Sequence, residues 1–297
     1  MRMRLGLAGA VACAGMLACG LWPAALGSTG AATAQLKVVF DSARTGRYRI
    51  YAKLPNGVAT LLVSDTGGAD FAPAISPSGR LVAFTRRVNG NYDIDLAPVA
   101  GGRLTTVTRN PAIDAFPSWA PSGRIAFESN RAGGNWDIYV ESGGAVTRLT
   151  TSTAVDALPA FSPDGTRIAF DSNRGGGHYQ IMLIPAGGGT ATALTSTASS
   201  QNVQPAWSPD GTRIAFSSNR SGRYQIYTMH ADGTGVTRVT SDSADDYQPS
   251  WSPDGSRIVF VSNAGGQAHV YMVNPNGSGQ TRVSVHGGEL PEWALIP

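Results

Sequence analysis

Few residues of this chain are placed so that they could do chemistry together. The sequence contains no G-x-S-x-G nucleophile motif, no H-E-x-x-H metal motif, and no phosphate-binding glycine loop followed by a helix. A metal site needs ligands that converge on one point, whereas the four histidines stand at unrelated places: His178, His230, His269 and His286. We therefore predict no catalytic residue, no metal site and no cofactor.

One polar series is regular enough to form a site. Five residues stand three positions before prolines that recur along the chain: Asp70, Asp114, Asp156, Asn202 and Asp246. Gly288 breaks the series before the last of these prolines. Three arginines recur in Ser-Asn-Arg sequences between the prolines: Arg131, Arg174 and Arg220.

These polar residues permit two interpretations. In the first, each aspartate caps a loop or pairs with a neighbouring arginine and so joins adjacent repeats, a structural device that repetition favours. In the second, they form a rim that binds a cation or a basic peptide, because an opening lined by one sign of charge focuses the electric field. The choice depends on the elements that position them.

Those elements come from a repeat of 42 to 46 residues, marked by six prolines: Pro73, Pro117, Pro159, Pro205, Pro249 and Pro291. Each proline is followed two residues later by a large apolar anchor, and in the five full copies by a Ser-Pro-Asp-Gly type of turn. Proline suits the second position of a type I turn, and glycine takes the left-handed conformation that closes a hairpin. An apolar run ending in phenylalanine, the Ser-Asn-Arg loop and two further strands complete the unit.

Four strands of four to six residues in about 44 residues are the size of a propeller blade. We predict an all-β protein, a six-bladed β-propeller of four-stranded blades, rather than a β-sandwich with accidental similarity between hairpins. The polar series then lies in the loops that enter the innermost strands and surrounds one mouth of the central channel. The Ser-Asn-Arg loops open on the same face, and the Pro-Asp-Gly turns on the other.

The two ends of the repeat region complement each other. Residues 37–63 match the second, third and fourth strands of a unit, and residues 291–297 match a first strand alone. We predict that they combine into the sixth blade, because an open ring would expose two unpaired strand edges.

Residues 1–34 have the features of a secretory signal peptide: a basic start, an apolar run from Leu5, and Ala-Thr-Ala before Gln35. We predict cleavage after Ala34, with lipidation of Cys19 as the alternative. The propeller then spans 35–297. Both cysteines, Cys13 and Cys19, lie in the leader, so the exported domain is expected to have no disulfide.

The tandem P-x-[WF]-S-P-D-G-x-R-I-A-F-x-S-N-R units resemble the repeats of the TolB-type six-bladed propellers of the bacterial envelope. The resemblance covers about residues 37–297 and implies the propeller type more specifically than a function, because similar repeats occur in propellers of prolyl-oligopeptidase-like enzymes and of oligogalacturonate lyases. It extends to the propeller repeats alone, without the N-terminal α/β domain of TolB, which puts a full TolB role in doubt.

We expect a periplasmic or secreted, non-enzymatic and monomeric propeller that binds an envelope protein or peptide at its channel face, where an acidic rim would favour a cationic partner. Arg2 and Arg4 are two of the 23 basic residues, and none of the 20 acidic residues lies in 1–34. The exported part therefore carries 21 basic and 20 acidic side chains, which argues against a nucleic-acid groove. The alternative is an envelope enzyme of the propeller lyase or glycosidase kind.

Overall fold

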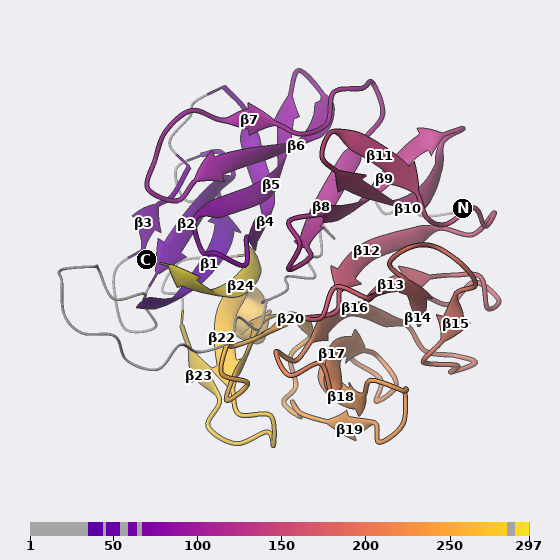
Figure 1. Ribbon diagram of the computed structural model, residues 1–297. Helices are drawn as coiled ribbons and strands as arrows, with labels where there is room; N and C mark the ends of the chain where they lie inside the picture. The colour runs from indigo at the N-terminus through magenta and orange to yellow at the C-terminus, as the bar shows by residue number, and fades with distance from the viewer. Residues whose placement is uncertain (1–34, 44–45, 54–58, 64–66, 284–288, 297) are drawn as a thin grey trace, which may run out of the picture.

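The computed structural model describes residues 35–43, 46–53, 59–63, 67–283 and 289–296. The predicted leader, its cleavage site and Cys19 lie outside these residues, as do Gly288 and His286. Figure 1 shows the strands arranged as sheets around a central axis. In the part of the chain that the structure describes, no helix has the length and apolar character needed to cross a membrane.

The strands form six four-stranded antiparallel sheets, which we name as blades. The closing blade contains β24 (Glu289–Ile296), β1 (Gln35–Ser42), β2 (Arg49–Lys53) and β3 (Thr60–Leu61). Blade one contains β4 (Ala69–Ile75), β5 (Leu81–Val88), β6 (Asn91–Pro98) and β7 (Thr105–Thr106). Blade two contains β8 (Asp114–Trp119), β9 (Ile125–Ala132), β10 (Asn135–Ser142) and β11 (Ala145–Arg148).

Blade three contains β12 (Asp156–Phe161), β13 (Arg167–Ser172), β14 (Gln180–Pro185) and β15 (Thr192–Ala193). Blade four contains β16 (Asn202–Trp207), β17 (Arg213–Ser218), β18 (Gln225–His230) and β19 (Thr237–Arg238). Blade five contains β20 (Asp246–Trp251), β21 (Ile258–Ser262), β22 (His269–Val273) and β23 (Thr281–Arg282), with a short 3₁₀ turn, η1 (Ala264–Gly266), after β21.

The predicted closure is confirmed. Strand β24 pairs antiparallel with β1, with Trp293 opposite Val38, so the end of the repeat region supplies the first strand of the blade that begins it. The six inner strands contact one another in a closed circuit of β24, β4, β8, β12, β16 and β20. Because all six are equivalent in their blades, they begin at the same end of the axis, which we call the aspartate end.

The repeated turns and anchors do what their sequence predicts. In blade three the N–H of Gly165 donates to the carbonyl of Ser162 at 2.7 Å, and Gly165 has φ +69°, the left-handed conformation that closes this hairpin. The anchor of each inner strand is buried between blades. Two tryptophan anchors also bond to the preceding blade: the indole N–H groups of Trp119 and Trp207 donate to the carbonyls of Ala74 and Ala160 at 3.0 and 3.1 Å.

Each inner strand of blades one to five contains a bulge that the sequence analysis did not anticipate. The residue before the repeat proline has positive φ at all five positions: Ala72, Phe116, Leu158, Gln204 and Gln248. Such a conformation in a non-glycine residue costs on the order of 1–3 kcal/mol. It is held by side chains of the preceding blade, which accept the bulge N–H: Glu128 accepts from Leu158 at 2.8 Å, and Asp171 accepts from Gln204 at 2.9 Å.

These acceptors occupy one position of the repeat, directly after the phenylalanine of the second strand: Asp41, Thr85, Glu128, Asp171 and Ser217. They are buried between neighbouring blades. Burial raises the pKa of Glu128 to about 8, and burial also raises the pKa of Asp171 well above its usual range. The blades are therefore joined by side-chain acceptors that sequence reasoning had not singled out.

Candidate functional site

The predicted polar series lies at one end of the ring, but in the strands and not in the loops before them. Asp114, Asp156, Asn202 and Asp246 are the first residues of their inner strands, and Asp70 is the second residue of β4. All five side chains are fully buried. The loop placement expected from the sequence was wrong, because each of these residues already pairs in register with the second strand, as Asp156 does with Ser172.

The three arginines contact members of this series within their own blades. Arg131 Nη2 lies 2.7 Å from Asp114 Oδ2 in blade two, and Arg174 Nη2 lies 2.7 Å from Asp156 Oδ2 in blade three. In blade four the partner is neutral: Arg220 Nη2 donates to Asn202 Oδ1 at 2.6 Å. These three contacts tie the end of the second strand, or the loop directly after it, to the inner strand of the same blade and do not join neighbouring blades.

Blade one has a different arrangement around Asp70. Here one arginine comes from the closing blade: Arg49 Nη1 lies 3.4 Å from Asp70 Oδ2. Arg86 of β5 lies 3.7 Å from the other carboxylate oxygen. The predicted joining of adjacent blades is therefore seen at Asp70, where the cation is carried by the preceding blade.

A serine and an aromatic ring complete the surroundings of each arginine in blades two to four. The Nε groups of Arg131, Arg174 and Arg220 donate to the hydroxyls of Ser129, Ser172 and Ser218 at 3.1, 2.9 and 3.0 Å. Their guanidinium carbons lie 5.2 to 5.5 Å from the ring centres of Phe127, Phe170 and Phe216, within the range of a cation–π contact. We call this set of an acidic or amide residue, a serine and a phenylalanine the arginine cradle.

Blade five has the cradle residues but no arginine at the equivalent position, where Ala264 follows Ser262 and Asn263. Among the residues that the structure describes, neither carboxylate oxygen of Asp246 has a hydrogen bond of normal geometry. Burial raises the pKa of Asp246 to about 6, although the nearby hydroxyls of Ser262 and Thr240 act in the opposite direction. The aspartate end is therefore asymmetric, with an arginine beside the buried side chain in blades one to four and none at the equivalent position in blade five.

Aromatic side chains gather at the same end, a feature that the sequence analysis missed. The third strand of each blade starts at this end, and a half-buried aromatic residue stands there in five blades: Tyr48, Tyr92, Trp136, Tyr179 and Tyr224. Two of them pack against the next blade, since the ring centres of Tyr48 and Phe71 are 4.9 Å apart and those of Tyr224 and Tyr247 are 5.0 Å apart. The recurrence of Tyr or Trp after each loop was the available signal.

The histidines do not form a common site in the described part of the chain. His178 Nδ1 lies 3.1 Å from the Gln201 amide in blade three, His230 is exposed in blade four, and His269 contacts Arg282 in blade five. Within the described residues no group of three His, Cys, Asp or Glu side chains is arranged to hold a metal ion.

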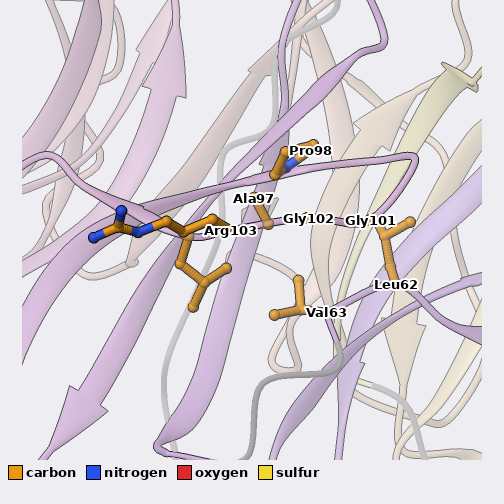
Figure 2. A pocket seen from close by; sticks show the side chains of 8 residues that line it. Leu62, Val63, Ala97, Pro98, Gly101, Gly102 and Arg103 are labelled. Carbon is orange, nitrogen blue, oxygen red and sulfur yellow. The ribbon is translucent and has the colours of Figure 1, made fainter.

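A groove of about 440 Å³ lies between the closing blade and blade one, and Figure 2 shows its lining. Leu62 and Val63 form one side, and the turn between β6 and β7 forms the other, with Pro98 and Gly101. This turn connects the third and fourth strands, so it lies at the end opposite to the aspartates. The groove is thus separate from the arginine cradles.

The fold and its repeated cradles define a six-bladed β-propeller made of tandem four-stranded units. Residues 194–295 match the family model described as the TolB beta propeller domain. The repeats in this region are therefore similar to those of the TolB-type propellers, as the sequence motifs predicted. No curated protein matches the chain significantly.

Solved structures give the same result for the fold. TolB from Acinetobacter baumannii superposes with a TM-score of 0.77 at 25% identity, over 88% of this chain and 66% of that chain. A putative TolB from Agrobacterium tumefaciens superposes with a TM-score of 0.68 at 23% identity, over 87% of this chain and 92% of that chain. An oligogalacturonate lyase in complex with manganese superposes with a TM-score of 0.62 at 17% identity, over 84% of this chain and 73% of that chain. The chain thus spans about two thirds of the Acinetobacter protein.

Proposed function

We propose that this propeller is an exported, non-enzymatic binding protein of the bacterial envelope, and that its aspartate end receives a protein or peptide partner. The observation that carries the proposal is the gathering of half-buried aromatic residues and arginines around one end of a rigid ring. Aromatic residues and arginine are the types enriched at protein interfaces and at their energetic centres. The likeness to TolB structures supports the envelope location.

The surface chemistry of this end fits a partner better than a small substrate. Tyr92 carries Arg87 at 5.6 Å from its ring centre, and Arg223 stands beside Tyr224 with 62% of its side chain exposed. Flat aromatic faces with flanking cations offer contact area at low conformational cost. The enzymatic alternative requires histidines, lysines or carboxylates clustered on the channel, whereas within the described residues no three His, Cys, Asp or Glu side chains are grouped to hold a metal ion.

Capture from an envelope extract tests the proposal. The purified protein and its Tyr92→Ala and Tyr224→Ala variants are immobilised, and retained proteins are identified and quantified. We expect a specific partner that is lost from both variants, because truncating an aromatic residue at the centre of an interface costs about 2–4 kcal/mol. Val236→Ala is the control, since Val236 is 40% exposed and follows the turn at the opposite end.

Two results would contradict the proposal. Retention of the same proteins by the tyrosine variants and the wild type would show that the aspartate end is not the binding surface. Cleavage of pectic or other acidic polysaccharides by the purified protein, measured by release of unsaturated or reducing ends, would favour the enzymatic alternative instead.

A further inference from the structure

The arginine cradle is a repeated device with well-defined parts. In blade three it consists of the Asp156 carboxylate, the Ser172 hydroxyl and the Phe170 ring, which together surround the guanidinium group of Arg174. In blades two and four a tyrosine of the third strand adds a second ring: Tyr139 lies 5.0 Å from the Arg131 guanidinium, and Tyr227 lies 4.9 Å from that of Arg220.

Blade five keeps these parts and lacks the arginine. Asp246 and Ser262 face each other in register, and the rings of Phe260 and Tyr271 stack at 6.0 Å, as those of Phe216 and Tyr227 do at 5.9 Å in blade four. Residues 218–227 of blade four read SNRSGRYQIY, and residues 262–271 of blade five read SNAGGQAHVY. Arg220 and Tyr224 of blade four thus correspond to Ala264 and Ala268 of blade five.

In the described part of the chain, the polar atoms of this cradle are buried and make no hydrogen bond of normal geometry. Asp246 and Ser262 are both fully buried. Within the described residues, Oδ1 and Oδ2 of Asp246 and Oγ of Ser262 lack hydrogen bonds. In blades two and three the equivalent atoms bind the guanidinium group. A buried carboxylate with only the hydroxyls of Ser262 and Thr240 nearby, neither in normal hydrogen-bond geometry, costs free energy that a cationic donor would recover.

The loop beside this cradle is made of small residues. Arg131 and Arg174 are 24% and 27% exposed in their cradles, so one arginine side chain spans the distance from the surface to the carboxylate. In blade five the equivalent loop contains Ala264, and Gly265 and Gly266 are exposed with no atom within 4 Å of an added Cβ. The alanines and glycines leave room where blade four carries Arg220 and Tyr224.

We propose that the blade-five cradle of Asp246, Ser262, Phe260 and Tyr271 binds the guanidinium group of an arginine side chain presented by the partner. The arginine takes the place that the chain's own arginines occupy in blades two to four. This inference rests on the proposed function and deepens it: the partner must carry an accessible arginine, and blade five fixes the orientation in which it docks.

A titration with N-acetyl-arginine amide, followed by amide chemical shifts in the full chain, tests the cradle directly. We expect saturable shifts at Ser262 and Ala264, and binding at least about tenfold weaker for the uncharged N-acetyl-citrulline amide, because a hydrogen bond between charged groups is worth more than a neutral one. Asp246→Asn is expected to weaken binding of the arginine probe by about tenfold or more.

One further variant makes the test independent of folding defects, and a second extends it to blade three. Ala264→Arg gives blade five the Ser-Asn-Arg motif of blade four, with an arginine that can fill the cradle. It is therefore expected to raise the melting temperature and to abolish binding of the probe. Arg174→Ala opens the cradle of blade three and is expected to add a second saturable response at Ser172. Equal binding of arginine and citrulline probes, or an unchanged response in Ala264→Arg, would overturn the inference.

The partner capture described above separates this inference from the proposed function. If the arginine probe binds but no envelope protein is retained, the cradle stands and the proposed function fails. If a partner is retained equally by the wild type and by Ala264→Arg, the aspartate end binds it without the cradle, and the inference fails while the proposed function stands.

Discussion

At the scale of single residues, the difference between an aspartate and an asparagine decides what each arginine contributes. Arg174 neutralises the buried carboxylate of Asp156, whereas Arg220 donates to the neutral amide of Asn202. Both arginines also lie over a phenylalanine ring at similar distances. The two sites therefore form a comparison in which the buried partner is charged beside Arg174 and neutral beside Arg220, which also has the Tyr227 ring next to it.

We predict that Arg174→Ala destabilises the protein more than Arg220→Ala. Removing Arg174 leaves a buried, uncompensated carboxylate, a change that costs about 3–5 kcal/mol. Removing Arg220 leaves an unsatisfied amide oxygen, at about 1–3 kcal/mol. The free energy of unfolding in urea measures both. Equal losses would mean that packing over the rings, and not the ion pair, is what the arginines contribute.

The sequence predicted where the polar series lies in the ring but could not predict that its side chains are buried. The spacing from the repeat prolines placed Asp114 and its equivalents at one end of the ring, and the shared Ser-Asn-Arg motif placed the arginines beside them. Whether such carboxylates are exposed depends on how far the inner strand extends, and the structure begins that strand at the aspartate itself. Burial of this kind is a tertiary property that no local pattern encodes. Whether these residues form a binding rim stays a prediction.

At the scale of the elements, the bulge of each inner strand shows where repeat patterns stop being informative. Turn chemistry and the buried phenylalanines predicted four strands per blade and their order. The positive φ of Leu158 or Gln204 was not predictable, because it is imposed by an acceptor in a neighbouring blade, Glu128 or Asp171. Those acceptors vary among acidic residues, Thr and Ser, so the motif that marks the other positions is absent there.

The strand that closes the ring leads to a prediction about the element itself. Deleting 291–297 removes part of β24, exposes the edges of β1 and of the neighbouring inner strands, and removes the buried Trp293. We expect a large drop in melting temperature, measured by circular dichroism. Trp293→Ala alone is expected to cost about 3–5 kcal/mol.

Val146→Ala serves as the neutral comparison for this deletion, because Val146 is an exposed residue of β11. A deletion variant that melts at the wild-type temperature would show that β24 is not needed for closure of the ring.

At the scale of the whole molecule, acidic groups sealed between blades couple the stability of the ring to pH. Burial raises the pKa of Glu128 to about 8, and burial raises the pKa values of Asp171 and Glu292 well above the usual range. In the unfolded chain these groups lose their protons at ordinary acidic pH. The folded protein therefore binds more protons than the unfolded chain, and its stability falls as the pH rises.

We predict that the protein is more stable at about pH 5 than at about pH 8. For Glu128 alone the loss is on the order of 4 kcal/mol over this interval. Glu128→Gln keeps an acceptor for the Leu158 N–H and removes the ionisation, so it should flatten part of the slope and stabilise the protein at pH 8. Urea unfolding at a series of pH values measures this. An unchanged slope in Glu128→Gln would show that Glu128 is ionised in the folded protein.

Pairing of β24 with β1 also determines the order in which this protein can be completed. The two strands are encoded at opposite ends of the repeat region, so blades one to five can form hairpin by hairpin while the closing blade still lacks its inner strand. Contacts this distant in sequence are slow to form. The ring therefore stays open until residues 289–296 are in place, and the edge of β1 is exposed throughout that time to any other strand that can pair with it.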